Sequence, residues 1–340
     1  MRIALLPLVC ACLSAAILAQ EPQKKARAPR RPIIVTATRL SQDPFDVPFA
    51  TAQIDQQKIR RRAYRTMPQT LRDVPGVMVQ ETGHGQGSPY IRGFTSFRTL
   101  LMIDGIRLNN SVFRPGPNQY WNTVDPLSID RLEVVKGPSS VLYGSDAIGG
   151  TVNVFTKSPD LYAEDRGFAR GLGSYLRYSG AEDSIQGRAE LSLGYTFEDG
   201  ERTGVLIGGN IKHYGDLEGG RDVGTQPGTG YDENDFDLKI EHHLDADTYL
   251  SFLHQRVSQN DVPRTHKTID GINWRGLSNG SDLRRDFEQD RYLTYLQFHR
   301  QNMDGFLDSL DAGVSFQEQD QVRDRISGTG WNSAVCRVLL

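Results

Sequence analysis

The sequence contains only three cysteines, and two of them, Cys10 and Cys12, lie in its one long uncharged run. That run, Ile3–Ala19, has 17 residues, which is the lower limit for a membrane-spanning helix. Its length and its small residues predict a signal peptide at 1–19, with an N-terminal anchor helix as the alternative. The mature chain then keeps only Cys336, so an internal disulfide is excluded.

The chain also lacks an excess of charge of either sign, since 39 basic residues face 42 acidic ones. No basic cluster is interleaved with aromatic residues, so nothing indicates nucleic-acid binding. No pairing of nucleophile with base and no metal-ligand spacing is recognisable, so we predict no enzyme, no cofactor and no metal site. The hydrophobic content of 38% suits a soluble protein, but also a membrane β-barrel, whose strands are apolar only at alternate positions.

Residues 20–43 form a polar, basic, proline-bearing stretch, which predicts a disordered tether. Inside it lies one β-prone island, IIVTATR, at 33–39. A lone strand in a tether has no partner of its own. It is either the first strand of the next domain, or it docks onto that domain, or it offers its edge to another protein by strand addition.

Residues 44–158 have a compact α/β pattern. Thr66 and Pro68 predict the start of a short helix. The dipeptide Asp104-Gly105 joins two apolar runs and predicts a hairpin. Gly149-Gly150 leads into the strand TVNVFTK. Two glycine- or proline-rich stretches, ETGHGQGSPY and NNSVFRPGPNQYW, are expected to be loops.

From 167 to 325 the apolar pattern changes to a period of two. About seven strands of roughly ten residues follow, and this length lets a tilted strand cross a bilayer. Short and long links alternate, with short ones at EDGER, Asp245–Asp247 and QNMDG. A soluble sandwich has no reason to keep its short turns at one end, so the pattern favours an antiparallel transmembrane β-barrel.

A set of motifs in a fixed order resembles the TonB-dependent outer-membrane receptors. They are IIVTATR, LRDVPGVMV, YIRGF, LLMIDGIRLNN and IDRLEVVKGPSSVLYGSDAIGGTVNVFTK, and they cover about residues 33–157. The resemblance implies an α+β plug domain at 44–158 inside a barrel in the outer membrane of a Gram-negative type cell. In such barrels about 22 strands are used, so the barrel part is expected to be incomplete and the chain a truncated, frame-shifted or partial product. Residues 326–340 lose the alternation and are expected to be an atypical tail.

The resemblance also implies a function without covalent chemistry. The energy-coupling box would pair with the periplasmic energy-transducing protein TonB, which works with an inner-membrane complex. The solute would be a ferric siderophore first, then haem or cobalamin. The alternatives are a non-transporting receptor for signalling or adhesion, or a non-functional fragment. The residues of the box are Ile33, Ile34, Val35, Thr36, Ala37, Thr38 and Arg39.

Candidate substrate contacts lie in the two predicted loops, which face the external cavity in related receptors. His84 could ligate haem iron or be a solvated loop histidine. Aromatic residues beside a cation and amides suit a large, partly anionic ligand, although Tyr120 and Trp121 could equally pack under their loop. The full set is His84, Gln86, Phe113, Arg114, Asn118, Gln119, Tyr120 and Trp121.

Two groups of charged residues remain. The resemblance implies that plug charges meet wall carboxylates and fix the seating of the plug. These charges are Arg92, Arg131, Glu133 and Lys136. A second group, Asp232, Glu233, Asp235 and Asp237, could bind calcium, but its spacing favours a solvated acidic loop.

Overall fold

The computed structural model describes residues 35–39, 42–109, 115–117, 119–159, 162–164, 166–220, 223–271, 273, 278–303, 305–327 and 330–339. The predicted signal peptide, most of the tether, and Ile33 and Ile34 lie outside these residues. In the described part of the chain, no helix is long and apolar enough to cross a membrane.

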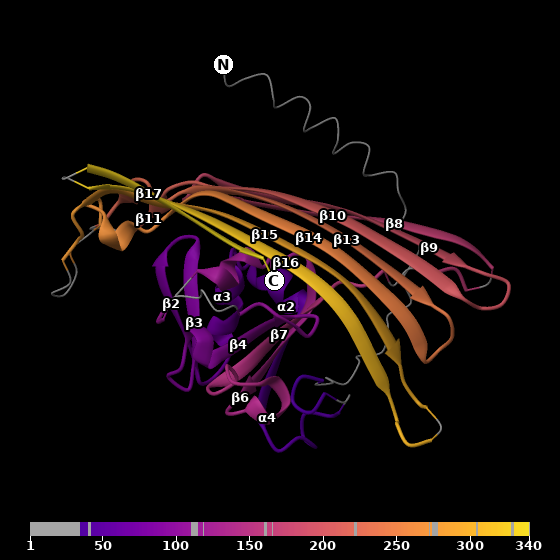
Figure 1. Cartoon of the computed structure of the whole chain (residues 1–340). Coiled ribbons are helices and arrows are strands. Elements are labelled where there is room, and N and C mark those ends of the chain that lie inside the picture. Colours follow the sequence, from indigo (N-terminus) through magenta and orange to yellow (C-terminus); the bar gives the residue numbers. More distant parts are fainter. Residues whose placement is uncertain are drawn as a thin grey trace, which may run out of the picture. The chain divides into compact units, whose positions relative to one another are not determined.

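The first domain is an α/β unit, which we call the plug (Figure 1). Its main sheet has five strands in the order β1-β6-β7-β4-β5, and a separate hairpin pairs β2 with β3. Its strands are β1 Ala50–Asp55, β2 Val77–Gly83, β3 Gln86–Ile91, β4 Thr99–Ile103, β5 Ile106–Arg107, β6 Ile129–Lys136 and β7 Gly150–Thr156. Its helices are α2 Gln56–Arg62, α3 Met67–Thr70 and α4 Ser140–Tyr143, with single 3-10 turns η1 Leu71–Asp73, η2 Ser96–Arg98 and η3 Tyr120–Thr123.

Local sequence signals account for much of the plug. Asp104 and Gly105 both have positive φ, 49° and 80°, as the predicted two-residue hairpin between β4 and β5 requires. The predicted helix after Thr66 is α3, with Pro68 in its first turn. At Gly150 a Cβ would lie 2.5 Å from the carbonyl oxygen of Val135, so only glycine lets β7 lie this close to β6. The stretch expected to be a loop around His84 is instead the β2–β3 hairpin.

The second domain is an eight-stranded antiparallel sheet, which we call the wall. Its order is β17-β16-β15-β14-β13-β10-β9-β8. The strands are β8 Gly167–Ser179, β9 Ser184–Thr196, β10 Arg202–Tyr214, β13 Tyr231–His243, β14 Thr248–Pro263, β15 Asp282–Arg300, β16 Leu310–Ser327 and β17 Gly330–Leu339. One link carries the small hairpin of β11 Leu217–Glu218 and β12 Thr225–Gln226, and another carries η4 Thr265–Lys267.

The wall has the reverse of a soluble protein's burial pattern. On β13, Asp235 and Asp237 are only 8% and 5% exposed, whereas Phe236 between them is 43% exposed. On β10 and β8, Ile211 and Leu172 are 71% and 85% exposed. A sheet that exposes its apolar face and buries its polar face is built for lipid on one side and a polar lumen on the other. The predicted membrane-barrel strands are confirmed.

The links at one end include 197–201, 244–247 and 301–309, and those at the other include 180–183, 215–230 and 264–281. The two longest links lie at the same end, as predicted, but 180–183 is as short as 244–247, so the predicted strict alternation of short and long links is wrong for this first link. Strands β14 and β15 extend further than their weak alternation predicts, because β-pairing continues past the register shift between Gln259 and Val262. The segment expected to be an atypical tail pairs with β16 as β17, so backbone pairing here does not depend on an alternating pattern.

Candidate functional site

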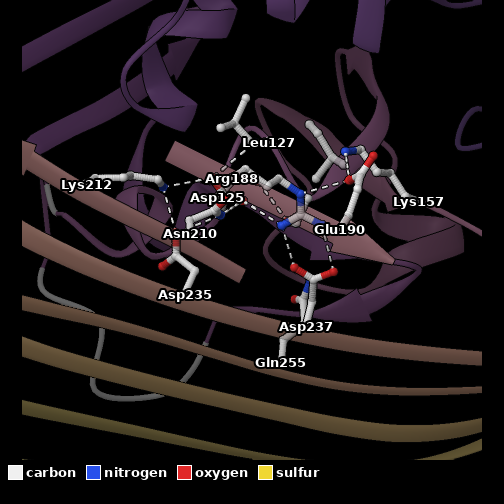
Figure 2. Close-up of polar contacts among 12 residues, drawn as sticks. Asp125, Leu127, Lys157, Arg188, Glu190, Asn210, Lys212, Asp235, Asp237 and Gln255 are labelled. Carbon is white, nitrogen blue, oxygen red and sulfur yellow. Dashed lines mark hydrogen bonds and ion pairs between the residues drawn. The ribbon is translucent and has the colours of Figure 1, made fainter. Parts of the chain in front are cut away.

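Plug and wall meet at a buried ion cluster centred on Lys212 of β10 (Figure 2). The Lys212 ammonium lies 2.7 Å from Oδ1 of Asp125, which belongs to the plug segment between η3 and β6. On the neighbouring strand β13 it lies 2.5 Å from Oε1 of Glu233 and 2.7 Å from Oδ2 of Asp235. The Lys212 side chain is 0% exposed, so the plug carboxylate completes an ion cluster shielded from solvent.

Arg188 of β9 extends this cluster to Asp237 and Glu190 of the wall (Figure 2). Its guanidinium donates to both carboxylate oxygens of Asp237, at 2.7 and 2.9 Å, and its Nε donates to Glu190 at 3.0 Å. Lys157, which directly follows β7 of the plug, donates to the same Glu190 carboxylate at 2.7 Å. A second plug–wall ion pair thus adjoins the first.

Asp125 is the plug residue on which the cluster depends. Burial alone would raise the pKa of its carboxyl, but the Lys212 ammonium and the Arg188 guanidinium hold that pKa below the usual range. Asn210 donates to its Oδ2 at 2.5 Å, and the backbone N–H of Leu127 donates to its Oδ1 at 3.1 Å. Asp125 is therefore an ionised, fully hydrogen-bonded anchor.

The carboxylates of Asp125, Glu233 and Asp235 offer oxygens within 4.8 Å of one another, a spacing that could hold a metal ion. The ammonium of Lys212 lies within 2.7 Å of all three and supplies the cation itself. The interpretation of the acidic residues 232–237 as a solvated loop is wrong, whereas calcium binding there stays a hypothesis. The segment is a strand, and alternation places three of its acidic side chains against the plug, while Asp232 alone is exposed.

A second anchor is Asp104, in the turn between β4 and β5. Its carboxylate accepts hydrogen bonds from the backbone N–H of Thr156, at 2.9 Å, and from the hydroxyl of Tyr295 on β15, at 2.8 Å. Gln297 of the same wall strand donates to its carbonyl oxygen at 3.1 Å. Lys239 of β13 lies 3.8 Å from its carboxylate. The hairpin predicted from the sequence therefore also touches the wall.

The predicted plug–wall charges are not the ones that the structure uses. Arg131 and Glu133 lie on β6 and pair with each other at 3.0 Å, and the Arg131 guanidinium also covers the ring of Phe155, 3.8 Å from its centroid. Lys136 donates to the carbonyl oxygen of Pro75, and Arg92 is exposed. In the described part of the chain these side chains therefore have their partners within the plug or are exposed, and the wall carboxylates there pair with other residues.

His84 lies in the β2–β3 turn and is buried, with 3% of its surface exposed. Its ring centroid lies 5.0 Å from that of Tyr214 and 5.7 Å from that of Tyr231. Burial lowers the pKa of the imidazole to about 4. A neutral ring packed against two wall tyrosines, whose own rings lie 4.7 Å apart, is neither a solvated loop residue nor open to an external ligand, so both interpretations are corrected. Gln86, beside it, is 3% exposed.

The second predicted ligand loop is only partly described. Phe113, Arg114 and Asn118 lie outside the described residues. The others are buried: Gln119 is 0%, Tyr120 5% and Trp121 0% exposed. Tyr120 and Trp121 belong to the main hydrophobic core with Leu253 and Leu293 of the wall. The packing alternative therefore holds for these two aromatic residues in this structure.

The described part of the energy-coupling box, Val35–Arg39, is a turn and not a strand. The N–H of Arg39 donates to the carbonyl oxygen of Val35 at 2.8 Å, and Arg39 has a φ of 62°. Thr36 and Ala37 are buried against the plug, at 1% and 0% exposed. The expectation of a free strand is wrong for these residues, because the plug offers their backbone donors a buried carboxylate.

The sequence pattern left Asp125, Lys157, Arg188 and Lys212 unnoticed. Arg188 and Lys212 occupy positions of the polar face in strands that were predicted, so alternation alone marks them as lumenal. A basic residue on such a face needs a buried carboxylate partner. The partner's identity follows only from the way the plug packs on the wall.

Comparison with known proteins places the plug in one family. The family model of the TonB-dependent Receptor Plug Domain matches residues 43–151. The chain is similar to the vitamin B12 transporter BtuB of Vibrio vulnificus, with 37% identity over 131 residues, which are 38% of this chain and 21% of that protein. It is similar to the iron-regulated outer membrane virulence protein of Vibrio cholerae, with 38% identity over 149 residues, which are 42% of this chain and 22% of that protein.

A solved structure extends the likeness from the plug to the wall. The copper transporter OprC superposes with a TM-score of 0.61 at 18% identity, over 81% of this chain and 38% of that chain. At this identity the likeness concerns the fold alone. The alignments thus span well under half the length of each of these proteins.

Proposed function

Since the chain belongs to the TonB-dependent receptors of the outer membrane, we propose that it serves the TonB-dependent active uptake of a scarce, large solute. No covalent reaction is part of this proposal. The plug would obstruct the lumen until the periplasmic energy-transducing protein, working with its inner-membrane complex, pulls on the coupling box.

The observation that supports this proposal is the set of buried polar contacts between the plug and the wall. Asp125 and Lys157 contact the wall through ion pairs with Lys212 and Glu190, respectively. Asp104 accepts a hydrogen bond from Tyr295. Buried polar contacts can be exchanged for contacts with water once the plug shifts, whereas a purely apolar interface has no such substitute. This interface supports a plug that is held in place at rest and displaced under load.

For the solute, we propose a ferric siderophore, with cobalamin and haem as the other candidates. One similar protein is named for vitamin B12 and another for iron regulation, so the relatives support cobalamin and an iron-containing solute as candidates. Growth on single iron sources, with and without the gene, tests the first choice. A defect restricted to limiting cobalamin would overturn it in favour of the second.

The coupling step has its own test. Ile34→Pro removes a backbone donor that strand pairing requires, so uptake should be abolished while solute binding is kept. The solute tested is the one that the growth experiment identifies. Equal loss of binding and uptake would show that the segment is structural and would contradict the coupling assignment.

A further inference from the structure

Glu133 of β6 is a plug carboxylate that takes no part in seating the plug on the described wall. We define the coupling segment as Val35–Arg39. The Glu133 side chain is 0% exposed and lies beside this segment. One oxygen, Oε2, accepts three hydrogen bonds from that segment. The donors are the backbone N–H of Val35 at 3.0 Å, the backbone N–H of Thr36 at 2.9 Å and the hydroxyl of Thr36 at 2.7 Å.

The other oxygen of this carboxylate is held from within the plug. Nε of Arg131 donates to Oε1 at 3.0 Å, so the carboxylate is fixed in place and paired with a cation. Hydrogen bonds to an ionised acceptor are about twice as strong as neutral ones. The three bonds at Oε2 therefore form a strong, preorganised docking point for this short piece of chain.

The rest of the coupling segment adds weaker contacts to the same plug surface. Tyr143 donates its hydroxyl to the carbonyl oxygen of Thr36 at 2.9 Å. The guanidinium of Arg39 donates to the carbonyl oxygen of Leu142 at 2.7 Å and lies 4.8 Å from the centre of the Tyr143 ring. Ala37 is buried with Val47 and Val135.

Of the two adjacent backbone donors that Glu133 occupies, a strand partner needs one, because successive N–H groups of an extended strand point to opposite edges. A partner that adds to this segment as a β-strand needs an extended backbone with outward N–H groups free. In the structure both N–H groups point at Oε2, and the segment is curled into a turn. The docked form and the strand-paired form therefore exclude each other at Val35 and Thr36.

From this geometry we propose that Glu133 is the positioning residue that holds the coupling segment on the plug and so sets the fraction of molecules able to engage the energy transducer. The inference rests on the proposed function for its meaning in transport, but the docking itself is a property of this chain alone. A partner that binds only the released segment loses apparent affinity in proportion to the docked fraction.

The test compares amide hydrogen exchange at Val35 and Thr36 in the full chain, folded in detergent micelles, with and without Glu133→Gln. The isosteric amide keeps the shape and removes the charge. We expect exchange at these two positions to become at least ten-fold faster while β6 keeps its protection. The matched control is Asp130→Asn, on the same strand, whose exposed carboxylate lies 3.8 Å from Arg131 and makes no contact with the coupling segment as the structure describes it, so exchange at Val35 and Thr36 should stay close to that of the native chain. Unchanged exchange in folded Glu133→Gln would overturn the proposal.

A second variant covers the case in which Glu133→Gln does not fold. Thr36→Val removes only the hydroxyl donor and lies outside the plug sheet, so it spares the plug core. It should still speed exchange at Val35 about three-fold or more, and no change there would also overturn the proposal.

Titration with the periplasmic domain of the energy transducer distinguishes the docking role of Glu133 from the coupling function. Binding that becomes about ten-fold tighter in Glu133→Gln supports both the docking role and the coupling function. Faster exchange without tighter binding supports the role of Glu133 and counts against the coupling function.

Discussion

The Lys212 ammonium of the wall lies 2.7 Å from the Asp125 carboxylate of the plug, and both side chains are at most 1% exposed. Such a pair is costly to half-break, because the remaining charge stays buried without its partner. Glu233 and Asp235 share the same ammonium, so its loss would leave three carboxylates facing one another.

Lys212→Met should therefore destabilise the folded chain by about 3–5 kcal/mol. Urea unfolding of protein refolded in micelles, followed by tryptophan fluorescence, measures the change. The control is Lys267→Met, at an exposed position in η4. A loss below about 1 kcal/mol would mean that water reaches the cluster and screens it.

Arg188→Lys should weaken the adjoining ion pair between wall strands β9 and β13, and it should destabilise the chain by a smaller amount. The guanidinium reaches both oxygens of Asp237, and a lysine ammonium cannot reproduce two parallel hydrogen bonds. We expect a loss of about 1–3 kcal/mol. Asp237→Asn in the same background should then cost less than it does beside the native arginine, because the two residues share one interaction. Additive losses would contradict this coupling.

His84 should make the stability of the plug depend on pH. Burial lowers the pKa of His84 from 6.5 to about 4, so the unfolded chain binds a proton more readily than the folded chain in that interval. The free energy of unfolding therefore keeps its full value above pH 6.5 and decreases as the pH falls toward 4, by up to about 3 kcal/mol.

The measurement is urea unfolding at pH values between 7 and 4. In His84→Phe the part of the pH dependence that lies above pH 4.5 should become much smaller, and the remainder should come from His266, whose pKa burial also lowers. The part near pH 4 and below should remain, because Asp125 keeps its lowered pKa. A native and a variant profile of the same slope above pH 4.5 would exclude His84 as its source.

Gly150→Ala should destabilise the plug, since the added Cβ would lie 2.5 Å from the backbone oxygen of Val135 and 2.9 Å from Ile91. Backbone atoms cannot move aside cheaply, so we expect a loss of about 1–3 kcal/mol. Gly187→Ala on β9 is the comparison, because its Cβ would meet only Leu176 at 3.9 Å. Protease resistance and urea unfolding should both distinguish the two variants.

The sequence by itself determined many of the local elements, although it missed the β2–β3 hairpin and strand β17. Asp104-Gly105 specifies its turn through backbone preference, and alternation along β13 assigns each side chain to one face, because both signals act between near neighbours. What only the tertiary structure decided was the choice of partners. The pairing of Lys212 with Asp125 joins residues far apart in the chain, and the burial of His84, Tyr120 and Trp121 depends on how the plug packs on the wall. For the same reason Glu133 binds the coupling segment and not the wall, since its strand presents it to a short piece of chain nearly a hundred residues earlier.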